Sequence, residues 1–313
     1  MKALLLSLAL TAGAGEPNPP AKTAASKQEM LWTKLEARVG EIATRLDGVM
    51  GVAILDLSGG RLLLRSADEV FPAASSIKLP LLVELYRQEQ QARKSSPGTG
   101  RLGEPYVFDP KDLVDDSRIM AGLTPGATRL TNRDLAQFVV AVSDNAATNV
   151  LIDRVGMGNV NGMLRGLGLG EIKLRRKMMD LEAARRGDEN VATPRQMVEL
   201  LRKLYRREIL EPDLTEDLLR LLSTPKKSHL PRLLPAGVAV ANKSGELEGV
   251  RTDSGIVLVK DRPFAISVMT AYDRDELEAE TAIGEVALLA YRHFEMLARA
   301  SEYGRVISPG DSR

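Results

Sequence analysis

The chain has 313 residues, of which 44% are hydrophobic, enough to bury a large core in one domain or in two packed lobes. Its 43 Lys and Arg residues nearly balance its 42 Asp and Glu residues, so charge does not favour nucleic acid as a partner. The absence of cysteine excludes disulfides, thiolate catalysis and thiolate metal sites. The two histidines, His229 and His293, are far apart and belong to no paired ligand motif, so we expect no metal and no cofactor.

The N-terminus has the pattern of an export leader. Residues 1–14 combine a lysine, a short apolar stretch and the small residues Ala12-Gly13-Ala14, which predicts a signal peptide. The proline-containing residues 15–27 then form a flexible lead-in. No later segment has the apolar run that a membrane span needs. We therefore expect a periplasmic or secreted protein; the alternative is a frayed N-terminus on a cytoplasmic one.

Helical and strand-like patterns follow one another in a simple order along the rest of the chain. Helical periodicity occurs at residues 28–46, 76–94, 135–142, 146–155 and 278–300. Strand-like runs occur at residues 50–57, 61–65, 237–245, 250–260 and 264–272. The strands thus lie near the two ends of the chain, and helices dominate between them.

This order predicts an α+β fold with a five-stranded antiparallel sheet that is built from both chain ends and flanked by helices. An all-helical lobe is inserted in the middle. We expect residues 28–80 and 228–300 to form the sheet lobe, residues 81–227 the helical lobe, and residues 301–313 a loose tail. The cleft between two such lobes is a common place for an active site.

The stretch FPAASSIKLP places a serine three residues before a lysine at the start of an apolar helix. The backbone N–H of Ser75 would be free to point at an anion, and Lys78 would lie one turn further on the same face. The alternative is that Ser75 or Ser76 caps the helix and Lys78 is a solvated charge. A second Ser-x-x-Lys at Ser223–Lys226 precedes a turn and has no apolar helix behind it.

Two further motifs stand in settings that suit the same chemistry. Ser143-Asp144-Asn145 lies between two helices, where it exposes a hydroxyl and an amide, although a plain helix-to-helix turn is an equal alternative. Lys243-Ser244-Gly245 ends a strand, where glycine lets a ligand approach the backbone; a protective edge-strand lysine is the alternative. All three motifs in this order are far more specific than any one of them.

With these motifs, the sequence resembles the penicillin-recognising serine hydrolases, and within them the class A β-lactamases. The resemblance runs from about residue 30 to residue 298 and includes LTPGATRLTNRDLA, SDNAATNVLID and NKSGELEGVRTDSGIV. It implies an exported, monomeric hydrolase that acts on a small-molecule β-lactam through an acyl-serine.

The resemblance also implies a role for each matched residue. Ser75 is the nucleophile, Lys78 accepts its proton, and Ser143 passes a proton to the leaving nitrogen, with Lys243 as the nearby cation. The backbone N–H groups of Ser75 and Glu246 hold the oxyanion. The residues implied in substrate binding are Asn145, Ser244, Gly245, Glu246 and Arg251, together with Lys243.

The loop at residues 174–194 departs from the family pattern. It lacks the Glu-x-x-Leu-Asn string whose glutamate activates the deacylating water, and ungapped counting puts Lys177 or, in a shifted register, Met178 at that position. Asp180, and after it Glu182, are the carboxylates that could replace this base, although both could be surface charges. Asn190 falls near the position of an expected aspartate, so the loop is expected to lack its closing ion pair.

Glu246 is a second departure from the family pattern, in which a small or hydroxyl residue commonly follows the Lys-Ser-Gly motif. A carboxylate beside a carboxylate-binding site would repel the substrate unless its side chain turns away.

Three functions compete. The first is a β-lactamase that acts through acyl-Ser75. The second is a penicillin-binding D-alanyl-D-alanine carboxypeptidase or small-ester hydrolase with slow deacylation. The third is a non-catalytic wall-binding or sensing protein.

Overall fold

A computed structural model describes residues 24–94, 101–301 and 303–306. The expected signal peptide at residues 1–14 and residues 15–23 of the expected lead-in lie outside the described residues, as do residues 302 and 307–313 of the expected tail. Helix α1 (Ala24–Arg45) begins inside the range predicted as lead-in. None of the described helices combines the length and the apolar composition that crossing a membrane requires.

One antiparallel sheet brings the two ends of the chain together, in the strand order β2-β1-β9-β8-β7. Strand β1 pairs with β9 along its whole length, from Val49 opposite Ala271 to Asp56 opposite Phe264. The strands are β1 (Val49–Asp56), β2 (Leu62–Arg65), β7 (Val240–Leu247), β8 (Val250–Val257) and β9 (Phe264–Ala271). The predicted five-stranded sheet with strands from both chain ends is confirmed.

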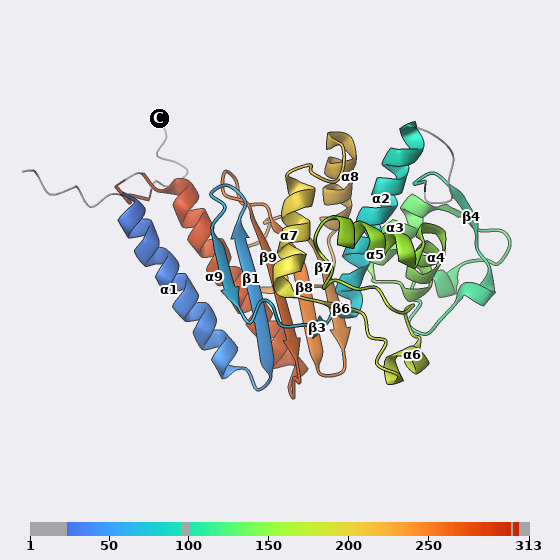
Figure 1. Cartoon of the computed structure of the whole chain (residues 1–313), viewed down its shortest axis with the longest axis horizontal. Coiled ribbons are helices and arrows are strands. Elements are labelled where there is room, and N and C mark those ends of the chain that lie inside the picture. The colour runs from blue at the N-terminus through green and yellow to red at the C-terminus, as the bar shows by residue number, and fades with distance from the viewer. Residues whose placement is uncertain (1–23, 95–100, 302, 307–313) are drawn as a thin grey trace, which may run out of the picture.

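Both faces of this sheet are covered, because successive side chains of a strand point to opposite sides. Val52 and Ile54 of β1 pack in a cluster with residues of α1 and of α9 (Glu276–Arg299). Ala53 and Leu55 belong to the other cluster, which includes residues of α7 (Pro194–Tyr205). Figure 1 shows α1 and α9 on one side of the sheet and α7 on the other. Helix α7 thus covers the sheet, although it lies in the range predicted for the helical lobe.

The remaining α-helices lie at the far side of α7 from α1 and α9 (Figure 1). They are α2 (Lys78–Lys94), α3 (Asn132–Ala141), α4 (Asn145–Val155), α5 (Met157–Gly166), α6 (Leu181–Arg185) and α8 (Pro212–Leu222). The 3-10 helices are η1 (Ala74–Ile77), η2 (Pro110–Asp112), η3 (Met120–Gly122) and η4 (Leu230–Leu233). Two short ladders pair β3 (Phe71–Pro72) with β6 (Val191–Ala192) and β4 (Pro105–Val107) with β5 (Arg129–Thr131).

The described part of the predicted loose tail folds back on itself. Ala300 and Val306 form an antiparallel bridge, and the backbone N–H of Ser301 donates to Arg305 O at 2.9 Å. The Lys27 amine of α1 donates to Tyr303 O at 2.9 Å. These contacts tie the described tail residues to the start of α1.

Candidate active site

The first part of the site is the junction between η1 and α2. Ser75 lies in η1, and Lys78 is the first residue of α2, which continues from η1 without a break. Because a 3-10 helix has three residues per turn, side chains three apart lie one above the other, which puts Lys78 on the same side as Ser75. Ser75 is partly exposed, whereas Lys78 is fully buried.

The second part is the short segment between α3 and α4, which carries Ser143 in a left-handed backbone conformation at φ 60°. The buried Asp144 fixes this segment from both sides. One carboxylate oxygen caps α4 by accepting from the Ala147 N–H at 2.9 Å, and the other accepts from the N–H groups of Ile119 and Met120 at 2.8 and 3.0 Å. Asp144 therefore holds the Ser143 backbone in place from its neighbouring position.

Two buried amines converge on the Ser143 hydroxyl. The Lys78 amine donates to Ser143 Oγ at 3.0 Å, to Ser143 O at 2.6 Å and to Asn145 Oδ1 at 2.8 Å. The Lys243 amine, from β7, donates to the same Ser143 Oγ at 3.1 Å and to Ser244 O at 2.7 Å. Among the hydrogen bonds of the described residues, none joins the Lys78 amine to Ser75 Oγ. The three sequence motifs therefore meet at Ser143.

The surroundings of both amines lower their pKa values. Burial and the positive charge of Lys243 hold the pKa of Lys78 well below its ordinary value, while the Asp144 carboxylate opposes this shift. Burial likewise lowers the pKa of Lys243 to about 7, with Asp253 opposing the shift and Lys226 adding to it. A neutral amine can accept a proton, so Lys78 has the electrostatic environment of a general base.

Glycine at position 245 allows β7 to lie directly against η1. A Cβ atom on Gly245 would be 2.5 Å from the backbone N of Ser75 and 2.8 Å from that of Ser76. The neighbouring strand β8 also contacts this segment, because Thr252 Oγ1 donates a hydrogen bond to Ala73 O at 3.1 Å. The strand that carries Lys243 is thus fixed next to the backbone of Ser75.

A cavity of about 410 Å³ opens over this junction. Six of the residues predicted for the site line this cavity: Ser75, Ser143, Lys243, Ser244, Gly245 and Glu246. Lys78 and Asn145 are buried beside it and are bonded to one another. The structure therefore brings together eight of the ten predicted site residues.

Four charged residues of the described cavity wall were not predicted: Asp116, Arg118, Lys226 and Lys227. Lys226 belongs to the second Ser-x-x-Lys motif, and burial lowers its pKa to about 8. The copy of the motif that has no helix behind it therefore contributes a lysine to the same cavity. Asp116 and Arg118 come from the segment before η3, where no sequence motif marks them.

The other two predicted residues lie elsewhere among the described residues. Arg251 bonds the carboxylates of Glu276 and Glu280 and the carbonyls of Leu247 and Val250, and it is not among the residues that line the cavity. Its four bonds occupy the guanidinium that was predicted to bind the substrate carboxylate. That role stays a prediction, and this placement does not favour it.

Asp180 is exposed and caps the short helix α6, where its side chain accepts from the Ala183 N–H at 2.9 Å. It does not line the cavity either, and the same holds for the exposed Glu182. A general base must lie within hydrogen-bond reach of its water, so the predicted role of Asp180 gains no support from this position.

The loop between Arg176 and Glu189 is closed by an ion pair, so the expectation that it lacks one is wrong. Arg176 Nη2 donates to Glu189 Oε1 at 2.8 Å. Asn190 adds to the closure, because its side-chain oxygen accepts from the N–H groups of Arg175 and Arg176 at 2.7 and 3.1 Å. The neighbour of Asn190 supplies the carboxylate that the aspartate position lacks.

Neither Lys177 nor Met178, the two residues that could occupy the position of the family glutamate, supplies a base. The Lys177 amine pairs with Asp153 at 2.6 Å. Met178 is buried, and its backbone is bonded by the side chain of Asn149 from α4, at 2.8 Å to the N–H and 3.1 Å to the carbonyl. The loop is therefore well anchored to the helical part, with a thioether and a paired amine at the two candidate positions.

Comparisons with known proteins agree with this geometry. Residues 34–294 match the Beta-lactamase enzyme family. The carbapenem-hydrolyzing β-lactamase KPC of Klebsiella oxytoca is 30% identical over 253 residues, 78% of this chain and 83% of that protein. β-Lactamase SME-1 of Serratia marcescens is 25% identical over 263 residues, 81% of this chain and 86% of that protein.

Solved structures give the same result. An ancestral class A β-lactamase superimposes with a TM-score of 0.75 at 27% identity, over 83% of this chain and all of that one. PBP-A superimposes with a TM-score of 0.74 at 25% identity, over 84% of this chain and 96% of that one. The fold and the site define a serine hydrolase of the β-lactamase fold. The chain belongs to the β-lactamase enzyme family, as a distant homologue of class A β-lactamases and of PBP-A, which confirms the resemblance seen in the sequence.

Proposed function

We propose that this protein is a serine hydrolase that opens β-lactam rings through an acyl-Ser75 intermediate. The observation that carries the proposal is the convergence of the Lys78 and Lys243 amines on Ser143 Oγ, in a cavity that Ser75 also lines. A non-catalytic binding protein has no use for a fully buried lysine with a lowered pKa such as Lys78, because burying it costs free energy without aiding recognition.

In the proposed reaction, Ser75 Oγ attacks the lactam carbonyl carbon and forms a tetrahedral oxyanion, which becomes an ester when the C–N bond breaks. Its proton passes to the neutral Lys78 amine, directly or through a water. The oxyanion is held by the backbone N–H groups of Ser75 and Glu246. The lactam C–N bond then breaks, and Ser143, which is bonded to both amines, gives its proton to the nitrogen while Lys78 returns the proton to Ser143.

The substrate we propose is a small anionic molecule. The described cavity wall contains four cationic side chains, namely Arg118, Lys226, Lys227 and Lys243, against two carboxylates, Asp116 and Glu246. A carboxylate on the substrate would be attracted by this excess, and Lys243 with Ser244 would be its partners. The signal peptide and the periplasmic or secreted location remain predictions. Both are consistent with a substrate that is met outside the cytoplasm.

One observation favours the second candidate, a penicillin-binding carboxypeptidase or ester hydrolase with slow deacylation. The described carboxylates of the cavity wall are Asp116 and Glu246, and neither comes from the loop that was expected to supply the base. A mutant of PBP-A, one of the structural neighbours, is known as an acyl-enzyme complex with penicillin G. We therefore expect decay of the acyl-enzyme, rather than its formation, to limit turnover.

One assay separates these functions. The purified protein is mixed with a chromogenic cephalosporin, and colour and intact mass are followed together. Sustained colour supports the β-lactamase, whereas one turnover with a persistent adduct on Ser75 supports the second candidate. Ser75→Ala should lose both signals with unchanged unfolding, and Ser223→Ala, in the other Ser-x-x-Lys motif, should keep them. No colour and no adduct from the parent protein would refute both.

A further inference from the structure

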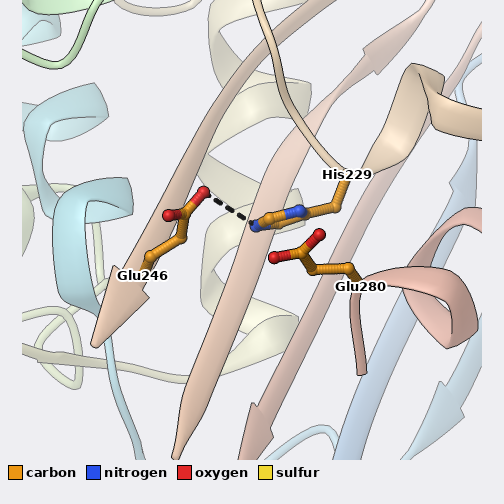
Figure 2. Close-up of side chains that lie close together, drawn as sticks. All are labelled: His229, Glu246 and Glu280. Carbon is orange, nitrogen blue, oxygen red and sulfur yellow. Dashed lines mark ion pairs between the residues drawn. The ribbon is translucent and has the colours of Figure 1, made fainter. Parts of the chain in front are cut away.

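Three side chains beside the end of β7 form a cluster that the proposed reaction does not use. They are His229, just before η4, Glu246 near the end of β7, and Glu280 in α9 (Figure 2). One ligand atom from each lies within 4.8 Å of the other two. The cluster thus joins three separate elements at the edge of the cavity that Glu246 lines.

The imidazole of His229 is the unusual member. Only 3% of the residue is exposed, and its Nε2 atom is buried without a hydrogen-bond partner among the described residues. Figure 2 shows this nitrogen pointing toward the carboxylate of Glu246, and Nε2 lies 3.7 Å from Glu246 Oε1. A buried polar atom without a partner destabilises the fold, so a ligand that binds Nε2 would remove that cost.

We propose that His229, Glu246 and Glu280 bind a divalent metal ion of the Zn²⁺ type. Zn²⁺ takes imidazole nitrogen and carboxylate oxygen at about 2.0–2.2 Å, and two tetrahedral ligands at that distance lie about 3.4 Å apart. The observed 3.7 Å between His229 Nε2 and Glu246 Oε1 is close to that separation. Small side-chain movements would complete the set, and a fourth position would stay open to water or an anion.

Two arginines already bond Glu280, and they are compatible with a metal ion. Arg232 Nη1 donates to Glu280 Oε2 at 2.8 Å, and Arg251 Nε donates to Glu280 Oε1 at 3.1 Å. A carboxylate has about four lone-pair sites, so each oxygen of Glu280 can still bind a metal ion while the two arginines hold the carboxylate in orientation.

The site is open to an ion from solvent, because the side chain of Glu246 is 56% exposed. A bound cation would neutralise the carboxylate that otherwise repels an anionic substrate at the cavity wall. This consequence rests on the proposed function, whereas metal binding itself does not. No sequence motif marks the cluster, since the two glutamates are distant from His229 along the chain.

The test is calorimetric titration of ZnCl₂ into the full chain, free of any histidine tag and treated with a chelator. We expect one saturable equivalent in the parent and in Ser75→Ala, which cannot form the acyl-enzyme. His229→Ala and Glu246→Gln should each weaken binding by more than about 100-fold, the upper end of the cost of losing an outer-shell partner. Glu246 is exposed, so Glu246→Gln keeps the test valid if His229→Ala does not fold.

Two matched variants complete the design. Glu248→Gln, two residues further on, and Glu276→Gln, the other carboxylate on Arg251, should bind Zn²⁺ as the parent does. The absence of saturable binding in the parent, or equal affinity in Glu246→Gln and the parent, would overturn the proposal. Either result would leave the reaction at Ser75 untouched, and a failed cephalosporin assay would leave the metal titration untouched.

Discussion

Lys78 and Lys243, which come from opposite sides of the site, share one acceptor, because Ser143 Oγ lies 3.0 Å from the first amine and 3.1 Å from the second. Two cations at this distance from one atom would repel one another strongly, so the pair is most stable when one amine is neutral. The proposed reaction uses this geometry with Lys78 neutral and Lys243 charged.

This arrangement predicts a bell-shaped dependence of the acylation rate on pH. Acylation needs a neutral Lys78, so the rate falls at low pH as Lys78 gains a proton. Binding of an anionic substrate needs a charged Lys243, whose pKa is lowered to about 7, so the rate falls again as pH rises through that value. Rates of adduct formation, measured by stopped flow from low pH to above pH 7, would show both the fall at low pH and the fall at high pH.

The matched variant for this profile is Lys243→Arg. A guanidinium stays protonated throughout, so the fall near pH 7 should disappear while the acid limb remains. If the alkaline limb of this variant coincides with that of the parent, Lys243 is not the titrating group.

Gly245→Ala should damage both stability and acylation. Its new Cβ would meet the Ser75 backbone N at 2.5 Å, and neither backbone can yield without moving the other. We expect a loss of about 1–3 kcal/mol in the free energy of unfolding, as for other overpacked sites. The acylation rate should fall about 10²–10³-fold, as after loss of an oxyanion donor.

The control for this change is Gly166→Ala at the end of α5, where the added Cβ would meet nothing within 4 Å. Urea unfolding and adduct formation should match the parent. A Gly245→Ala protein with the parent's acylation rate would show that the close approach of β7 to Ser75 does not matter for the reaction.

The sequence predicted the sheet because its strands carry strong local patterns, and it predicted Ser75, Ser143 and Lys243 because each lies in a motif at an element boundary. Arg251 and Asp180 show where such reasoning ends. Their positions in the sequence suit a role at the site. In the structure, however, Arg251 is bound by two carboxylates of α9, and Asp180 caps the N-terminus of α6. Local sequence carries no record of such long-range partners.

The same limit explains the loop closure. Because Asn190 stands near the position of the expected aspartate, the sequence predicted that the ion pair would be missing. In the structure the adjacent Glu189 pairs with Arg176 instead. Glu189→Gln should therefore cost about 1.5–3 kcal/mol in the free energy of unfolding, the range for hydrogen bonds to charged groups. Asp188→Asn, the neighbouring exposed carboxylate, should change it by less than about 0.5 kcal/mol. Equal urea midpoints for both variants would contradict the proposed anchor.

Asp180 offers a direct test of how the acyl-enzyme decays. Its side chain caps α6, and asparagine caps helices as well as aspartate does, so Asp180→Asn should keep both the fold and the decay rate of the adduct. If Asp180 were the general base, the same change would slow decay by about 10²–10⁴-fold. Asp180→Ala separates the two roles further, because it removes the cap at a cost of about 0.5–2 kcal/mol while a base role would again slow decay. Intact mass spectra taken over time after a single addition of cephalosporin measure decay in all three proteins, and an adduct that persists far longer in Asp180→Asn than in the parent would return the catalytic role to this carboxylate.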